Sequence, residues 1–464
     1  MTILALAAAL AIVAQDDASL RASPQSGATV LTALSQGDVI EVRGEQAEYL
    51  KVYNYRQERG GYLRREVARP LGLTETDAPA LLAVLRFLRE SRGSEALGIS
   101  YGAAYIKAVP VQSLTAEPFD AIARMAERLA NVASGNGSQA LAAHLQVVEQ
   151  FGVHMRSFEH SGRMQVCYDG ELFRRVLSMT SASAEQRAHA VLGLTRPDCI
   201  DPNLGPTARM ALDQERRQLL EQIDVSPLSA SLRSRVSARR ASVLASVSFA
   251  QARRRESPAP AAQRALDELL AANPNDLGED RRAEYVDAVA RVSAIRWAAE
   301  PAITQKGPLV LNTAPGETGQ TCVTLADTRQ SQELTRRCTY GIPWMASAKT
   351  IPSGPAIVLA VQPLESWLEL WVFHELAGNW RVDVLSPGAE EPELGYVEYA
   401  GFAPETRRLL IVREVKERGR FRRRFELLRL DDLAQVRFAS TPDLLRDFGR
   451  WQDVAWKRDT LSLH

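Results

Sequence analysis

Four cysteines and six histidines are the side chains of this sequence best suited to nucleophilic or metal chemistry. The cysteines are Cys167, Cys199, Cys322 and Cys338. No Cys-x-x-Cys pair occurs, and the spacings match no zinc site. His374-Glu375 begins the metalloprotease pattern, but Gly378 stands where that pattern requires its second histidine. The residues therefore predict neither a metal nor a cofactor.

Two candidate nucleophiles also lack their usual surroundings. Gly98-Ile99-Ser100-Tyr101-Gly102 matches the Gly-x-Ser-x-Gly elbow of hydrolases by letter, but that elbow follows a strand, and a helical pattern precedes this segment. Cys199 lies ten positions after His189, which would suit a thiol hydrolase. A reactive thiol at Cys199 conflicts with a disulfide at the same residue. We therefore expect no catalytic residues.

The cysteines are better explained as two disulfides, because an even, low number is typical of exported proteins. Four cysteines allow three connectivities, of which local pairing is the simplest: Cys167 with Cys199, and Cys322 with Cys338. Cys322 and Cys338 lie symmetrically about residue 330, between two segments with strand character. In an antiparallel hairpin centred there they would face each other directly.

The first 14 residues form an apolar run that ends abruptly at Gln15. A run of this length is too short to span a bilayer as a helix, and it resembles the apolar region of a signal peptide, with cleavage at Ala11 or Ala14. The alternatives are a hydrophobic first strand or a retained anchor, since no Lys or Arg precedes the run. We expect a signal peptide over 1–14 and a periplasmic or secreted protein that is not transmembrane after cleavage.

Chain length indicates the number of domains, and the net charge excludes one class of binding partner. The chain has 464 residues, and at roughly 150 residues per domain it should hold about three domains. Lys plus Arg and Asp plus Glu both number 56, so the formal net charge is zero. Proteins that bind nucleic acid electrostatically usually carry a basic excess, so no nucleic-acid partner is expected.

The hydrophobic pattern changes along the chain and predicts a multidomain α+β protein. Short strands separated by glycine turns occupy 18–69, and a period near 3.6 residues indicates a mostly helical domain over 76–300. Strand patterns return over 308–440, where an antiparallel β domain is expected, and 441–464 should form a C-terminal helix and tail.

The segment 18–69 resembles the bacterial SH3 (SH3b) family. The matching pieces occur in family order: Ala18–Pro24, Leu34-Ser35-Gln36-Gly37-Asp38, Tyr49-Leu50-Lys51-Val52 and Gly61-Tyr62-Leu63. The resemblance covers about one ninth of the chain. It implies a small SH3-like β-barrel and a binding module, because such domains often bind cell-wall peptides or other envelope ligands.

Tyrosine suits a shallow peptide groove, since it offers an apolar face and a polar tip. The candidate ligand-binding residues are Tyr49, Tyr53, Tyr55 and Tyr62. Tyr49 and Tyr62 stand where the family's aromatics commonly pack the core. Tyr53 and Tyr55 lie near the predicted hairpin at Arg56–Gly60 and are the better contact candidates.

Two segments of the β region are similar to β-propeller blades. Each has a proline turn, at Pro352 or Pro404, followed by apolar strands and a glycine turn. At most three such units fit between 309 and 440, fewer than a closed propeller needs. The expectation is therefore an antiparallel, partial-propeller-like domain.

Together these features predict an exported, non-enzymatic envelope protein whose SH3b-like module binds cell-wall peptide or a protein partner. The alternative is a cell-wall (peptidoglycan) hydrolase or its accessory subunit. A third reading is an assembly scaffold whose helices recruit a protein partner.

Overall fold

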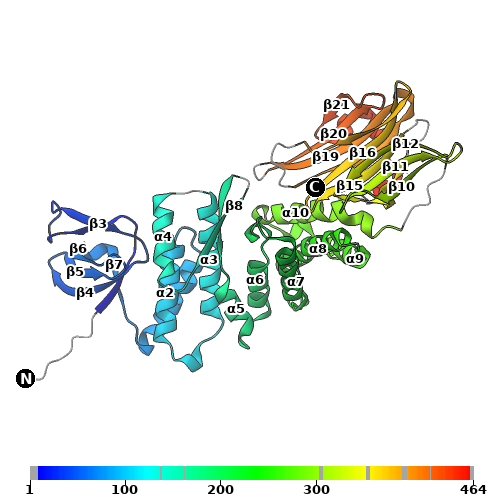
Figure 1. Cartoon of the computed structure of the whole chain (residues 1–464). Coiled ribbons are helices and arrows are strands. Elements are labelled where there is room, and N and C mark those ends of the chain that lie inside the picture. Colours follow the sequence, from blue (N-terminus) through cyan, green and yellow to red (C-terminus); the bar gives the residue numbers. More distant parts are fainter. Residues whose placement is uncertain are drawn as a thin grey trace, which may run out of the picture. The chain divides into compact units, whose positions relative to one another are not determined.

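The computed structural model describes residues 9–135, 138–160, 162–301, 307–351, 356–388, 394–417 and 420–459. Its internal contacts divide the chain into two compact units (Figure 1). Unit 1 comprises Met1–Leu204 and Gln222–Leu228, and unit 2 comprises Gly205–Glu221 and Ser229–His464. The division falls inside 76–300, which the sequence predicts as one helical domain. The early helices thus belong with the N-terminal strands, and the later ones with the C-terminal sheet.

Unit 1 begins with a seven-stranded antiparallel sheet in the order β3-β2-β6-β5-β4-β1-β7. The strands are β1 (Ala9–Val13), β2 (Ala18–Arg21), β3 (Val30–Leu34), β4 (Val39–Gln46), β5 (Tyr49–Asn54), β6 (Arg59–Arg64) and β7 (Ala68–Leu71). The expected barrel over 18–69 is corrected here: among the described strands β3 and β7 are edges that do not pair with each other, so this sheet is open. The sheet also begins before residue 18, the expected start of this domain, because it includes β1.

Strand β1 lies within the segment expected to be a signal peptide. Met1–Ala8 are outside the described residues, but Ala9–Val13 pairs with β4 on one side and β7 on the other. Ile12 and Val13 are fully buried. The boundary expected at residue 14 therefore lies beyond a buried strand. Cleavage after Ala14 would remove that strand from the sheet, and cleavage after Ala11 would remove its first three residues.

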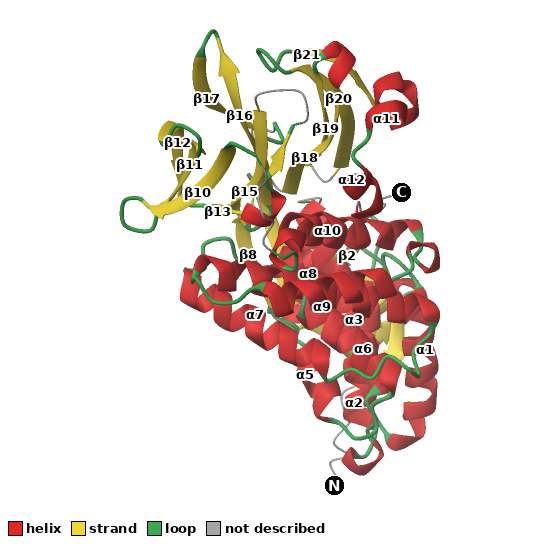
Figure 2. Cartoon of the chain, turned by 90° about the vertical axis from the view of Figure 1, so that its right-hand side faces the viewer, coloured by secondary structure: helices red, strands yellow, loops and turns green. Residues whose placement is uncertain are grey.

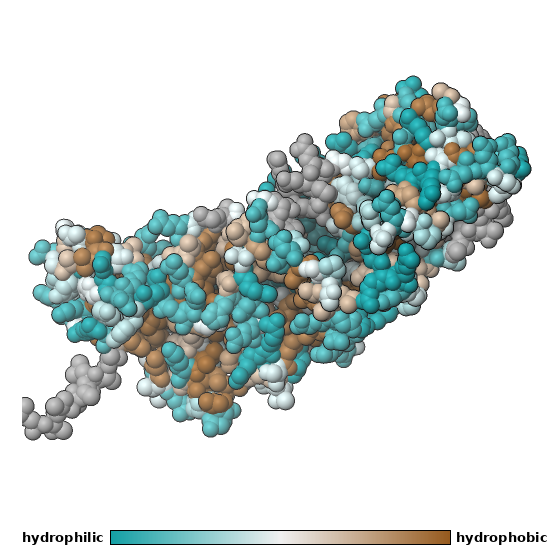
Figure 3. Space-filling model, in the orientation of Figure 1, coloured by the Kyte–Doolittle hydropathy of each residue, from teal (hydrophilic) through white to brown (hydrophobic). Residues whose placement is uncertain are grey.

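Helices and one hairpin complete the described part of unit 1. They are α1 (Ala78–Glu90), α2 (Glu95–Ala108), α3 (Glu117–Gly135), α4 (Gln139–Glu149), β8 (Met155–His160), β9 (Arg163–Tyr168), α5 (Glu171–Ser178) and α6 (Ala184–Leu194). Ile99, Met125 and Phe173 are among the largest side chains of their shared core. Some apolar side chains stay exposed, including Phe87 at 73%, and Figure 3 shows hydrophobic residues among hydrophilic ones over this layer.

A buried carboxylate near the start of α3 gives unit 1 a pH-dependent stability. Asp120 is 2% exposed, its Oδ1 atom has no hydrogen-bond partner among the described residues, and Arg124 Nη1 lies 3.9 Å from Oδ2. Burial raises the pKa of Asp120 to about 6, against the partial opposition of Arg124. The folded state thus holds this proton more tightly than the unfolded state, whose Asp pKa is about 3.9. Stability is therefore lost as the pH rises from about 4 to 6.

Asp120→Asn should accordingly stabilise the protein at pH 7, by about 2 kcal/mol, because the uncharged amide avoids much of the cost of burying an ion. At pH 4 the gain should largely vanish. Denaturant unfolding of both proteins at the two pH values measures this difference. An equal effect at both pH values would show that charge is not its cause.

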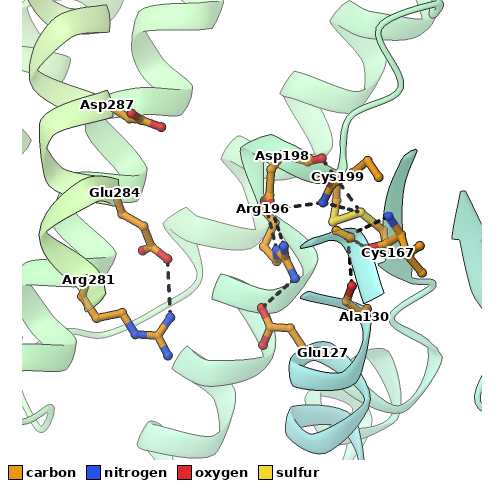
Figure 4. Close-up of polar contacts among 12 residues, drawn as sticks. Glu127, Ala130, Cys167, Arg196, Asp198, Cys199, Arg281, Glu284 and Asp287 are labelled. Carbon is orange, nitrogen blue, oxygen red and sulfur yellow. Dashed lines mark hydrogen bonds and ion pairs between the residues drawn. A yellow bond between two sulfur atoms is a disulfide. The ribbon is translucent and has the colours of Figure 1, made fainter. Parts of the chain in front are cut away.

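The two disulfides confirm the pairing expected from the sequence, in which each cysteine bonds to the one nearest to it along the chain. Cys167, at the end of β9, is joined to Cys199 with a Cα–Cα distance of 5.7 Å (Figure 4). The same region holds Arg196, which pairs with Asp198 and, at 3.6 Å, with Glu127 of α3. Cys322 is joined to Cys338 directly across a hairpin, with a Cα–Cα distance of 3.8 Å. Two covalent pairs indicate an oxidising, extracytoplasmic environment.

A non-reducing peptide map should therefore show two bridges, each within one unit, and the native protein should present no reactive thiol. Reduction should destabilise the protein, since closing a loop of 32 residues constrains the unfolded chain by roughly 3–4 kcal/mol in the loop-entropy account. Recovery of alkylated Cys167 from the untreated native protein would contradict this pairing.

Unit 2 packs four helices against β structure. The helices are α7 (Pro206–Glu221), α8 (Ala230–Arg253), α9 (Ala259–Ala271) and α10 (Glu279–Ile295). A three-stranded antiparallel sheet contains β10 (Leu309–Pro315), β11 (Thr321–Asp327) and β12 (Gln332–Thr339). The nine-stranded sheet contains β13 (Ile342–Pro343), β14 (Lys349–Thr350), β15 (Ala356–Leu364), β16 (Trp367–Leu376), β17 (Asn379–Leu385), β18 (Leu394–Ala403), β19 (Arg408–Glu417), β20 (Arg420–Arg429) and β21 (Gln435–Ala439).

The central strands of the large sheet are buried on both faces. The helices α8, α9 and α10 lie against one side of the large sheet (Figure 2). Leu410 and Val412 of β19 pack in a core with these helices, whereas the alternating Leu409 and Ile411 pack in a second core. This alternation follows from the two-residue period of a strand. The expected antiparallel β domain is confirmed in its coarse form, with one exception: β16 pairs with β18 in parallel.

That parallel pair joins the two blade-like segments into one continuous sheet. Pro352, at the first proline turn, lies outside the described residues, and Pro404 begins a single 3-10 turn after β18. The expected C-terminal helix appears as two short helices, α11 (Arg446–Trp451) and α12 (Val454–Asp459). Among the described residues, none of the helices combines the length and the apolar composition needed to cross a membrane.

Candidate functional site on the first sheet

The turn between β3 and β4, which contains Gly37 and Asp38, holds the first sheet against helix α2 of unit 1. Gly37 adopts a φ of +92°, and a Cβ there would lie 2.8 Å from the Ala96 carbonyl oxygen of α2. The Ser100 hydroxyl, also on α2, donates to the Gly37 carbonyl oxygen at 2.7 Å. Glycine is thus required both by the backbone conformation and by the close approach.

One buried ion pair stabilises this turn from within the sheet, and one further contact joins the sheet to α4. Asp38 is fully buried and accepts two hydrogen bonds from Arg56, each 2.8 Å long. Beyond β1, Asp16 Oδ1 lies 2.7 Å from Nε2 of His144 on α4. The Asp16–His144 contact therefore gives the sheet a second attachment to the helices of unit 1.

The four candidate tyrosines differ in their access to solvent. Tyr49 is 6% exposed and contributes to the interior, and Tyr62 is half-buried. Tyr53 is half-buried at the end of β5, and Tyr55, just beyond it, is 63% exposed. The rings of Tyr53 and Tyr55 lie edge to face with centroids 5.0 Å apart. The structure therefore places the rings of Tyr53 and Tyr55 in contact, and both residues are more exposed to solvent than Tyr49.

Strand β4 adds two charged residues to this pair. Glu41 lies directly opposite Tyr53 in the register, and a bulge follows between Val42 and Gly44. At the bulge, the guanidinium of Arg43 lies 4.3 Å from the centroid of the Tyr53 ring. We call the group formed by Glu41, Arg43, Tyr53 and Tyr55 the tyrosine surface.

Hydrogen bonds make the tyrosine surface a connected group. Glu41 Oε2 accepts from Arg43 Nε at 2.7 Å and from the Tyr55 hydroxyl at 3.0 Å. The Arg43 hydrogen bond, followed by that of Tyr55, lowers the pKa of Glu41 below its usual value. Glu41 is thus ionised at neutral pH. The edge-to-face contact of the two tyrosine rings and the stacking of Arg43 on Tyr53 restrict the orientations of these side chains.

A glycine on the neighbouring strand leaves room for this arrangement. Gly60 of β6 lies opposite Tyr53, and a Cβ there would approach Tyr53 Cδ2 to 3.3 Å. Sequence reasoning identified Tyr53 and Tyr55 but missed Glu41 and Arg43. Their alternation on β4, in Val-Ile-Glu-Val-Arg, was the available signal, because residues two apart share one face of a strand.

The tyrosine surface presents an aromatic ring, a guanidinium and a carboxylate that could contact a ligand. The Tyr55 ring supplies an exposed apolar face, the Arg43 side chain is 45% exposed, and Glu41 is 17% exposed beneath them. A guanidinium is a fixed donor for carboxylates, and a carboxylate can accept from an ammonium group. An aromatic pair beside both charges suits a short peptide that carries an apolar group, a carboxylate and an amine.

The residues considered above for catalysis have structural contacts instead. Ser100 lies within helix α2, where its hydroxyl also approaches the Ala96 carbonyl oxygen at 3.0 Å. Cys199 is in a disulfide. His374 is buried on β16, with Nε2 2.7 Å from Asp383 Oδ2. In the described part of the chain, no group of three or more His, Cys, Asp or Glu side chains is placed to bind a metal ion.

Comparison of the chain with protein-family models, with curated proteins and with solved structures finds no match.

Proposed function

We propose that this chain is an exported, non-enzymatic envelope protein whose first sheet acts as an SH3b-like binding module for cell-wall peptide. The tyrosine surface is the observation that carries the proposal. The two disulfides support the extracytoplasmic location. A protein partner in the envelope, rather than wall peptide, is the other ligand class that the experiment below distinguishes.

Cell-wall stem peptides fit the tyrosine surface by their chemistry. They carry free carboxylates and amines on a short backbone, which complement the partly exposed Arg43 and the ionised Glu41. The face of Tyr55 can cover an apolar side chain of the peptide. The connected hydrogen bonds of Glu41 hold the three side chains in place, which lowers the entropy cost of binding.

Co-sedimentation of the purified protein with isolated cell-wall material tests this proposal. Wild-type protein should sediment without releasing soluble wall fragments. The double variant Tyr53→Ala/Tyr55→Ala should bind at least tenfold more weakly, since it removes two aromatic contacts worth roughly 1 kcal/mol or more. Thermal unfolding of each variant shows whether the sheet is still folded.

Phe87→Ala is the matched control, because Phe87 is an exposed aromatic residue of the same unit outside the tyrosine surface. Its binding should equal that of the wild type. Release of wall fragments would favour the alternative, a wall hydrolase or its accessory subunit. Failure to sediment, with capture of an envelope protein that the double variant loses, would favour the protein partner. Equal loss in all variants would contradict the role of the tyrosine surface.

A further inference from the structure

A cavity of about 200 Å³ lies on the large sheet of unit 2, where β19, β20 and the edge strand β21 run side by side (Figure 2). Its charged and polar lining comprises Arg413 of β19, Arg422, Arg424 and Glu426 of β20, and Gln435 of β21. Arg413 lies directly opposite Arg424 in the register, and Arg422 is two residues from Arg424. The three arginines therefore share one face of the sheet.

One of these arginines is already paired. Arg413 donates to both oxygens of Glu426, from Nε at 2.9 Å and from Nη2 at 3.2 Å, and its Nη1 donates to the Ser386 carbonyl oxygen. Glu426 is 2% exposed, and no other acidic residue lines the cavity among the described residues. Three arginines against one glutamate leave the lining with an excess of two positive charges, so the cavity favours an anion.

Arg424 is the arginine best placed to receive that anion. It is exposed to solvent, and in the described part of the chain it has neither an ion pair nor a hydrogen bond. Its guanidinium lies 5.3 Å from the centroid of the Phe438 ring on β21. This contact with an aromatic ring leaves the N–H donors of the guanidinium available, so Arg424 can bind a carboxylate through two parallel hydrogen bonds.

The spacing of the cations indicates the shape of the anion. Arg422 is also exposed, and two residues along a strand separate its Cα atom from that of Arg424 by about 6.6–6.8 Å. Two guanidinium groups spaced in this way match two carboxylates on one short chain better than one compact anion. Val415, directly opposite Arg422, provides an apolar contact for the methylene groups between the carboxylates.

We propose that this cavity binds a small dicarboxylate, with one carboxylate on Arg424 and the other on Arg422. Arg413 and Glu426 keep their own ion pair, because each already satisfies the other. The volume suits a short acyclic acid rather than a drug-sized ligand, whose pockets usually measure about 300–1,000 Å³. This site belongs to unit 2 and is independent of the tyrosine surface.

Ligand-observed NMR on the full chain, at neutral pH and low ionic strength, tests the proposal with three probes. Glutarate carries two carboxylates, butyrate is the same chain without the second carboxylate, and inorganic phosphate is a compact anion. Glutarate should bind saturably at millimolar concentration and about tenfold more tightly than butyrate or phosphate, because it makes a second charge-assisted contact. Absence of saturable glutarate binding would overturn the proposal. Equal or tighter binding of butyrate or phosphate would contradict the match to two carboxylates.

Arg424→Gln identifies the site, because it removes one guanidinium and keeps a polar side chain. We expect it to weaken glutarate binding about tenfold. Arg437→Gln is the matched control: Arg437 is exposed on β21 and lies opposite Leu427, which places it on the other face of the sheet. Both variants change the net charge equally, and thermal unfolding of each shows whether the sheet is still folded. Unchanged affinity in Arg424→Gln, or equal loss in both variants, would overturn the proposal.

The chain's own carboxylates require a separate control. Glu390, Glu391 and Glu393 follow the cavity residue Gly388 in the sequence and lie outside the described residues. A variant with these three residues changed to Gln should bind glutarate with an affinity close to that of the wild type. Glutarate binding by this variant alone would show that the chain's own carboxylates occupy the cavity, and the proposal would then be wrong.

Discussion

Ile12→Ala is expected to destabilise unit 1 by about 3 kcal/mol, because Ile12 is fully buried in a strand with neighbours on both sides. Deletion of residues 9–14 should have a larger effect: it removes both ladders of β1 and leaves β4 and β7 unpaired there. Circular dichroism and denaturant unfolding measure both changes. The matched control is Val30→Ala, since Val30 is 48% exposed on the edge strand β3. It should cost less than about 1 kcal/mol.

This prediction also separates the two readings of the N-terminal run. The pairing of β1 on both sides predicts that this strand stays in the mature protein, so mass spectrometry of protein from cells should recover the peptide that contains Ala9–Val13. Recovery of a mature N-terminus at residue 12 or 15 would contradict the role of β1. An unchanged unfolding curve after deletion of residues 9–14 would contradict it independently.

Glu365→Gln should destabilise unit 2 by about 3 kcal/mol. Glu365 lies in the turn between β15 and β16, with its side chain 22% exposed. Its carboxylate accepts from Arg209 at 2.9 Å, from Arg291 at 3.1 Å and from the Ser246 hydroxyl. The substitution would leave the partly buried Arg291 without its carboxylate partner, which is the costly way to break an ion pair, whereas Arg209 would keep Asp213 at 2.9 Å.

The pH dependence of Glu365 follows from the same contacts. Burial by itself raises the pKa of Glu365, but Arg291, Arg209 and Ser246 outweigh it and lower the pKa below the usual value. The stabilisation is therefore present at neutral pH and lost as the pH falls through the lowered pKa. Unfolding measured at pH 7 and in acid should show the Gln variant converging with the wild type. Glu375→Gln, an exposed position on β16, is the control and should change little.

Local patterns predicted the features whose partners are close along the chain. The hairpin that contains Cys322 and Cys338 is an example. The symmetry of the two cysteines about residue 330 predicted that they face each other, and they do so although a bulge lies between Leu325 and Ala326. The helical period over 76–300 was likewise visible, and Tyr53 and Tyr55 were identified as the better contact candidates because they lie near the predicted hairpin at 56–60. In each case the sequence spacing itself determines which side chains share a face.

The remaining features depend on partners far apart in the chain. The sequence left both a signal peptide over 1–14 and a hydrophobic first strand open, because a continuous apolar run does not distinguish a leader from a strand with neighbours on both sides. Arg209 and Arg291 lie 156 and 74 positions from Glu365, so no local pattern indicated that the later helices pack with the C-terminal sheet.

Photo-cross-linking in cells tests the central claim most directly. A benzoylphenylalanine at position 55 places the reactive group on the tyrosine surface, and the same residue at position 87 is the control. We predict adducts from position 55 that carry cell-wall fragments or, if the ligand is a protein, one envelope protein, and no such adduct from position 87. Adducts with cytoplasmic proteins alone, or the same adducts from both positions, would contradict the account.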